Sequence, residues 1–258
     1  MEWITNKDTI IFDFGFDNEL DIELISNYTK LIFSNYKLNN ELFEHYANND
    51  FHNLKNRMGK FNKDVSNLPH SLTHLTFGHC FNQDVLKLPH NLTHLTFGWN
   101  FNQDISKLPQ GITYLTFGFR FNKNVSILPP FITHLTFGNY FNQDVISLPS
   151  FLTHLTFGSY FNQDVSTLPS TLTHLTFGFR FDQQYNVPSN IKYLKLDCNN
   201  SYIIDNLPNS IMELELNIFF DLQIDNLPTS IKKLVICKYS HYNKDLNCLP
   251  DFIEELQL

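Results

Sequence analysis

The sequence repeats with a period of 20 residues. The dipeptide Leu-Pro recurs at this spacing from Leu68-Pro69 to Leu168-Pro169, and Phe-Asn recurs in the same way from Phe61 to Phe161. Between them runs a segment of the type Leu-Thr-His-Leu-Thr-Phe-Gly, for example at residues 92–98. A fixed period of this length is typical of a solenoid, in which each repeat packs only on its neighbours.

The repeat is regular over residues 61–180, where six copies follow one another. Residues 181–258 keep the apolar positions and the turn prolines but lose the Thr, His and Gly, which indicates degenerate C-terminal repeats. We therefore predict one solenoid domain over residues 1–258, with thirteen turns. The expected strand centres lie near residues 14, 33, 56, 77, 97, 117, 137, 157, 177, 196, 216, 236 and 258.

Residues 1–60 are interpreted as degenerate N-terminal or capping repeats, because Tyr28–Tyr36 aligns without gaps on Ile132–Tyr140. Residues 21–26 are expected to form a short helical turn on the outer side. The alternative is a small, independent N-terminal domain of another type.

Each regular turn contains an alternation of apolar and polar residues that is typical of a strand. Leu75 and Phe77 should point inward, whereas His74 and Thr76 should point outward. Gly78 should permit a sharp turn or a positive φ. Six inward residues are expected in each turn, as in Phe61, Val65, Leu68, Leu72, Leu75 and Phe77. Two stacked columns of rings would explain why the chain contains 26 phenylalanines.

The polar residues of the turns have structural interpretations. Stacked asparagine side chains should bond to backbone groups that a curved coil leaves unpaired. The repeating aspartates should cap turns or be solvated. The asparagines are Asn82, Asn102, Asn122, Asn142 and Asn162, and the aspartates are Asp64, Asp84, Asp104, Asp144 and Asp164.

The combination L-P-x-x-L-T-x-L-T-F-G-x-x-F-N resembles the FNIP repeat, which is known chiefly from social amoebae and from large DNA viruses that infect amoebae. The chain reads Phe-Asn-Gln-Asp where the family name has F-N-I-P. The repeat is also similar to leucine-rich repeats. This resemblance implies a mostly β fold, a right-handed leucine-rich-repeat-like solenoid with one short parallel strand per turn of about 20 residues and little helix. It implies no catalytic activity and no ligand.

Composition excludes several classes of function. The net charge of −8 leaves no basic surface for nucleic acid or anionic lipid. The four cysteines have irregular spacing, no signal peptide is visible and no apolar run approaches eighteen residues. We therefore expect no membrane contact and an intracellular protein, in amoebal or host-cell cytoplasm. No catalytic set recurs, so we expect neither an enzyme nor a cofactor.

One outward column consists of rings: His74, His94, Tyr114, His134, His154 and His174. Neutral imidazoles at strand spacing could share a metal ion, but zinc needs convergent ligands, and parallel side chains on a flat ladder do not converge. Ring stacking and hydrogen bonds with the threonines are therefore favoured over a metal site. The neighbouring threonines, Thr76 to Thr176, could order water as ice-binding solenoids do, but the outward pair is His-x-Thr and curvature would spoil the match.

The two positions after each repeat glycine vary most, and they hold residues that are enriched in interface hot spots. These are Trp99, Phe119, Arg120, Tyr140, Tyr160, Phe179 and Arg180. Together with the ring column they are the candidate residues for binding a protein partner. The alternative is that the aromatic side chains fold back over the core.

These observations predict a non-enzymatic scaffold for protein–protein interaction, with an unidentified partner. The rival interpretation is a structural, self-assembling repeat protein. Leu258 would lie in the last strand, and an open strand edge is a template for pairing with another chain. Two alternatives therefore remain open. One is a homodimer formed through this C-terminal edge strand. The other is a monomer whose edge is protected by charges such as Glu254 and Glu255.

Overall fold

The computed structural model describes residues 2–38, 58–217, 220–224, 226–236 and 253–257. The chain forms two compact units. Unit 1 comprises Met1–Lys123 with Ile127–Ile132, and unit 2 comprises Asn124–Ser126 with Thr133–Leu258. Each unit is a mostly parallel β-solenoid with turns of about 20 residues and little helix, as the repeat predicts.

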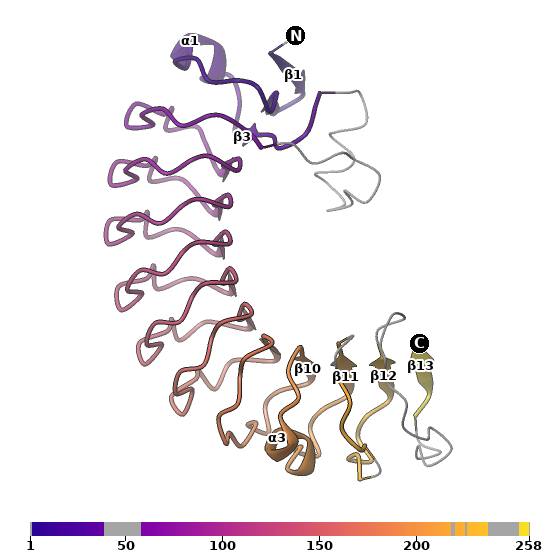
Figure 1. The fold of residues 1–258 in the computed structure, drawn as a ribbon. Helices are drawn as coiled ribbons and strands as arrows, with labels where there is room; N and C mark the ends of the chain where they lie inside the picture. The colour runs from indigo at the N-terminus through magenta and orange to yellow at the C-terminus, as the bar shows by residue number, and fades with distance from the viewer. Residues whose placement is uncertain (1, 39–57, 218–219, 225, 237–252, 258) are drawn as a thin grey trace. The chain divides into compact units, whose positions relative to one another are not determined.

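In unit 1 the strands lie side by side in chain order (Figure 1). The pairs from β2 to β6 are parallel, and equivalent residues face each other, as Leu75 faces Leu95. The elements are β1 (Trp3–Asn6), β2 (Thr9–Phe12), α1 (Ile22–Ile25), β3 (Lys30–Phe33), β4 (His74–Thr76), β5 (His94–Thr96) and β6 (Tyr114–Thr116).

The first strand was not predicted. β1 pairs with β2 in antiparallel fashion, and only two residues, Lys7 and Asp8, connect them. A connection this short allows only an antiparallel pair, because a parallel pair needs a crossover of a dozen residues or more. Lys7 takes the left-handed conformation of the turn, with φ of 50°. The sheet therefore begins with one antiparallel strand in addition to the parallel strand of each turn that was expected.

The strand expected near residue 33 is confirmed as β3, which pairs directly with β4 so that Leu31 faces Leu75. The helical turn expected at residues 21–26 is confirmed as α1, and the Asp21 carboxylate caps it by accepting from the Leu24 N–H at 3.1 Å. The strand expected near residue 56 lies outside the described residues. The assignment of all of residues 1–60 to repeats stays a prediction.

Unit 2 contains only parallel strand pairs among its described residues, again in chain order and with equivalent residues facing each other. A short helix that was not predicted, α3, begins after Asn200, whose side chain accepts from the Ile203 N–H at 3.1 Å. The elements are β7 (His134–Thr136), β8 (His154–Thr156), β9 (His174–Phe177), β10 (Tyr193–Leu196), α3 (Ser201–Asp205), β11 (Glu213–Leu216), β12 (Lys233–Ile236) and β13 (Glu255–Gln257).

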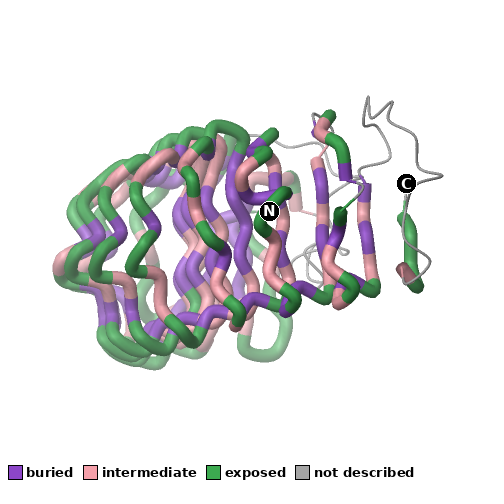
Figure 2. The backbone as a smooth tube through the Cα atoms, turned by 90° about the horizontal axis from the view of Figure 1, so that it is seen from below, coloured by how far each residue is buried: buried purple, intermediate pink, exposed green. Residues whose placement is uncertain are grey.

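The core follows the predicted inward set. Figure 2 shows buried and exposed stretches alternating along each turn. Five of the six inward positions are buried in every regular turn. The sixth, the leucine of Leu-Pro, is buried at Leu68, Leu88 and Leu108 but only half-buried at Leu128, Leu148 and Leu168.

The two phenylalanine columns are confirmed, and they also pack on each other. Neighbouring rings within a column are 5.7 Å apart for Phe77 and Phe97, and 6.2 Å apart for Phe81 and Phe101. Rings of different columns are closer: Phe77 and Phe81, the first phenylalanine of the next turn, have ring centroids 3.6 Å apart and planes 6° from parallel. Each ring therefore stacks on the other column as well as along its own, which fills the centre of the coil.

Glycine is required after the regular strands for a different reason from the one expected. No glycine among the described residues has a positive φ. Instead, a Cβ on Gly118 would lie 1.8 Å from the carbonyl oxygen of Gly98, and one on Gly178 would lie 2.0 Å from that of Gly158. Successive turns approach so closely here that only a residue without Cβ fits, whatever its dihedral angles.

The asparagine ladder is confirmed. The backbone N–H of Asn102 donates to Oδ1 of Asn82 at 2.8 Å, and that of Asn122 donates to Oδ1 of Asn102 at 3.0 Å. The same contact joins Asn162 to Asn142 at 2.9 Å in unit 2. Each amide thus satisfies a backbone donor of the next turn where no strand pairing is available.

Candidate partner-binding surfaces

The ring column on the sheet face is stacked in both units. In unit 1 the ring centroids of His74 and His94 are 4.1 Å apart, and His94 is 4.4 Å from Tyr114. In unit 2 the distance is 4.0 Å from His134 to His154 and 3.9 Å from His154 to His174. Tyr193, which the sequence pattern did not single out, extends the second stack at 5.5 Å from His174. The predicted ring stacking is therefore confirmed.

Hydrogen bonds with threonine hold the imidazole rings and lead to an expectation of which nitrogen carries the proton. The hydroxyl of Thr153 lies 3.0 Å from the carbonyl oxygen of Thr133 and 2.9 Å from Nδ1 of His154. The hydroxyl has a single proton and a carbonyl only accepts, so we expect this proton to go to Thr133, whose carbonyl also accepts from two backbone N–H groups. Nδ1 of His154 must then donate, which leaves Nε2 as the unprotonated nitrogen. The same pair of contacts fixes His94, through Thr93.

The stacked imidazoles are hard to protonate. Burial lowers the pKa of His154 to about 4, assisted by its histidine neighbours His134 and His174. Burial likewise lowers the pKa of His74 to about 4, assisted by the charges of His94 and Lys30. A neutral imidazole is the form that binds metal, but parallel rings hold their Nε2 atoms side by side and do not direct them to one point. Within the described ranges, no group of three His, Cys, Asp or Glu residues could hold a metal ion.

Towards the end of unit 2 the sheet face carries ion pairs in place of rings. Lys195 of β10 pairs with Glu215 of β11 at 2.5 Å, and Glu213 pairs with Lys233 of β12 at 3.0 Å. Lys232 pairs with Glu254 at 2.9 Å. The charges expected to guard the edge therefore join neighbouring turns, as opposite charges facing each other across a sheet do.

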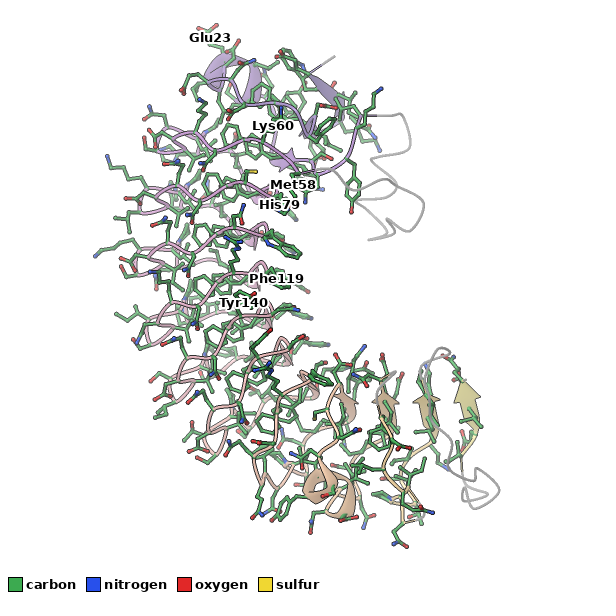
Figure 3. All side chains as sticks on the ribbon, in the orientation of Figure 1. Glu23, Met58, Lys60, His79, Phe119 and Tyr140 are labelled. Atoms are coloured by element: carbon green, nitrogen blue, oxygen red, sulfur yellow. The ribbon has the colours of Figure 1, made fainter. Side chains whose placement is uncertain are left out.

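The variable positions form a second surface, which we call the rim. The rim of unit 1 consists of the two residues after each repeat glycine: His79, Cys80, Trp99, Asn100, Phe119 and Arg120. The rim of unit 2 consists of Asn139, Tyr140, Ser159, Tyr160, Phe179 and Arg180. Figure 3 labels His79 and Phe119, which lie on the same side of unit 1, and Tyr140 of unit 2.

The rim of unit 1 is a stack of aromatic rings. Trp99 lies 5.4 Å from His79 and 3.9 Å from Phe119, and the planes of Trp99 and Phe119 differ by only 3°. The backbone holds these turns together, because the N–H of Arg120 donates to the carbonyl of Trp99 at 2.9 Å. Trp99 is 42% exposed, so this ring stacks along the surface and does not fold back over the core.

The rim of unit 2 combines tyrosines with an arginine. The rings of Tyr140 and Tyr160 meet edge to face at 5.0 Å. The guanidinium carbon of Arg180 lies 4.3 Å from the centre of the Tyr160 ring, which is a cation–π contact. Phe179 is 53% exposed, and the Arg180 N–H donates to the carbonyl of Ser159 at 2.9 Å.

The predicted binding residues therefore occupy two separate parts of each turn. The histidines and Tyr114 lie on the strands of the sheet face, and the other candidates lie on the rims. His79 is a rim ring that the hot-spot criterion left out, although its position after Gly78 would have identified it. Among the described residues, no helix is long and apolar enough to cross a membrane.

Comparisons with known proteins agree with this architecture. Among solved structures, the chain is similar to CroV588 of the giant virus CroV, described as a novel circular LRR protein structure, with 30% identity and a TM-score of 0.71. The match covers 100% of this chain but 44% of CroV588. A search of curated proteins found no match. The model of the FNIP repeat matches residues 81–120, 105–140, 141–180 and 181–218, which together exceed half of the chain. This chain therefore belongs to the FNIP repeat family.

Proposed function

We propose that the chain is a non-enzymatic scaffold that binds a protein partner through the rims of its two units. The observation that carries this proposal is the exposure of large aromatic side chains at the variable positions. Trp99, Tyr140, Tyr160 and Phe179 are all at least 39% exposed. Tryptophan, tyrosine and arginine dominate interface hot spots because each removes a large contact area from water at a low entropic cost.

The surrounding structure supports recognition at the rims. Backbone hydrogen bonds join the rims of neighbouring turns, as from the Arg120 N–H to the Trp99 carbonyl and from the Arg180 N–H to the Ser159 carbonyl. The same turns pack closely at their glycines, so the backbone of the rims is ordered before a partner arrives. Such preorganisation reduces the entropic cost of binding. The repeat motif does not dictate the residues after the glycine, so they are free to be chosen for a partner.

The test compares rim variants with variants of equally exposed rings elsewhere. In unit 1, Trp99→Ala is compared with Phe131→Ala, and in unit 2 Tyr160→Ala is compared with Phe151→Ala; Phe131 and Phe151 are both 54% exposed. Each protein is used for affinity capture from amoebal lysate, followed by crosslinking and mass spectrometry. A partner that the control variants retain and the rim variants lose supports the proposal. Equal capture by both kinds of variant contradicts it, as does turnover of a hydrolase or transferase substrate.

A second candidate is self-association through β13. Its three residues are exposed, and it pairs with β12 on one side. This would give a homodimer or a larger assembly of the chain itself. Sedimentation at tens of micromolar tests this candidate, and a monomer at every concentration rules it out.

The cellular setting is also a proposal. Cys80 and Cys198 are free thiols, and Cys198 is buried. Free thiols suit a reducing compartment, such as the cytoplasm of an amoeba or of another host cell.

A further inference from the structure

Charge is distributed unevenly over each turn. The chain contains 26 acidic residues, yet none of the twelve rim positions holds Asp or Glu, and two hold arginine. The repeating aspartates lie on another part of the coil. Hydrogen bonds from Ser66 lower the pKa of Asp64, assisted by the charge of Lys87, and those from Ser106 lower the pKa of Asp104, assisted by Lys107. An acidic protein therefore keeps its rims free of negative charge.

Among the described residues, the rim arginines have no carboxylate partner. Neither Arg120 nor Arg180 takes part in an ion pair with any residue that the structure describes. Burial and the positive charge of Arg120 together lower the pKa of the nearby His79. The field of the arginine thus acts along the rim of unit 1, whose own positions hold no acidic residue.

The arginine side chain of the unit 2 rim packs on an aromatic ring. Arg180 lies over the Tyr160 ring, with its guanidinium carbon 4.3 Å from the ring centre. The N–H groups point outward in the guanidinium plane and fit both oxygens of a carboxylate. Arg120 follows Phe119 on a rim whose Trp99 ring offers apolar surface. Each rim therefore places one cation beside aromatic rings.

We propose that the partner binds these rims through an acidic segment, a peptide stretch with Asp or Glu side chains next to aromatic or aliphatic ones. A carboxylate pairs with Arg120 or Arg180, and the apolar side chains pack on the rim rings. This inference rests on the proposed function and adds the chemistry of the partner. Carboxylate is favoured over phosphate because each rim has a single arginine, whose planar fork matches one carboxylate, whereas a phosphate carries nearly two negative charges at pH 7.

The experiment selects binders from a displayed library of random twelve-residue peptides against the whole chain. Enrichment of Asp or Glu together with aromatic residues is expected. Synthetic copies of the selected peptides are then measured with Arg120→Gln and Arg180→Gln. Replacing the arginine of the rim that binds the peptide should weaken the peptide's affinity by about tenfold or more, since a charge-assisted hydrogen bond contributes that much to affinity. Lys107→Gln and Lys192→Gln change the charge equally at exposed sites off the rims and should leave affinity unchanged.

Two further measurements distinguish failure of this inference from failure of the proposed function. Peptides with Glu and Asp replaced by Gln and Asn should bind about tenfold more weakly or worse, and a peptide on the rim of unit 1 should raise the NMR-measured pKa of His79. Selected peptides that lose binding with Trp99→Ala or Tyr160→Ala, yet carry no acidic residues or ignore both arginine variants, overturn this inference and leave the proposed function standing. If no selected peptide depends on a rim residue, both are wrong.

Discussion

Gly98 packs so closely on Gly78 that a Cβ atom on Gly98 would lie 1.9 Å from the carbonyl oxygen of Gly78. We expect Gly98→Ala to lower the free energy of unfolding by about 2–3 kcal/mol, because the two turns must separate to admit the methyl group. Gly111→Ala is the matched control, since its Cβ would lie 3.6 Å from the nearest atom. Urea denaturation measures both variants. Similar midpoints would mean that the turns are not in contact at Gly98.

The strand faces predict a large difference between Phe117 and Tyr114. Phe117 is 2% exposed and its ring lies 3.8 Å from that of Phe121, whereas Tyr114 is 41% exposed on the sheet face. Phe117→Ala should cost about 3–5 kcal/mol through cavity formation. Tyr114→Ala should cost much less, because it opens no cavity. Equal losses in chemical denaturation would show that the inward and outward faces are reversed.

The free energy of unfolding should decrease as the pH is lowered, because the stacked histidines resist protonation in the folded chain. Burial, with the charges of His134 and His174, lowers the pKa of folded His154 to about 4, below its ordinary value of 6.5. Between these values the unfolded chain binds more protons than the folded chain, so the free energy of unfolding decreases as pH falls from about 6.5 to about 4. Above about 6.5 the contribution is fully present.

His154→Tyr is the control for this pH dependence, because tyrosine already occupies the equivalent position at Tyr114, and a phenol in water does not ionise between pH 4 and 7. Denaturation at several pH values between 4 and 7 should show a shallower dependence in the variant. An NMR titration of His154 near its ordinary pKa, or identical pH profiles for the two proteins, would contradict the prediction.

The hydrogen bonds of Thr153 predict the tautomer of His154. Long-range proton–nitrogen NMR spectra should show a protonated Nδ1 and a bare Nε2, because the threonine hydroxyl already donates to Thr133. Thr153→Val removes the acceptor for Nδ1 and should cost about 1 kcal/mol while releasing this preference. Thr156→Val is a change of the same shape on the strand that carries His154, and it leaves the contact intact. A protonated Nε2 in the native protein would refute the assignment.

The sequence predicts the core well because the buried positions recur with the same period as the sequence repeat. Leu75 and Phe77 alternate with polar residues, and every copy of this pair is buried in the regular turns. The role of Asn102 was equally predictable, since a polar side chain that recurs in every turn has its own copies as neighbours. β1 and α3 were missed because each is a single irregular element, outside the repeat that carried the prediction.

The candidate site was predictable as a set of residues but not as a surface. The variable positions after each glycine could be read directly, and they identified Trp99 and Arg180 among the candidates. The contacts between these residues could not be predicted from the sequence. Trp99 and Phe119 are 20 residues apart, and their 3.9 Å stack depends on the spacing of the turns. The reason why each regular turn requires a glycine could not be predicted either. Local patterns suggest dihedral freedom, whereas the distance between Gly78 and Gly98 exists only in the folded coil.

The sequence by itself determined the length of the turn, the residues that face inward and the family of the repeat. These follow from periodicity, since alternation places side chains on one face or the other before any turn meets its neighbour. Only the tertiary structure decided which side chains meet. Strands spaced about 4.8 Å apart bring together residues a full turn apart in the chain. The histidine stacks, the pairing of Glu213 with Lys233 and the aromatic rims therefore arise from contacts between turns.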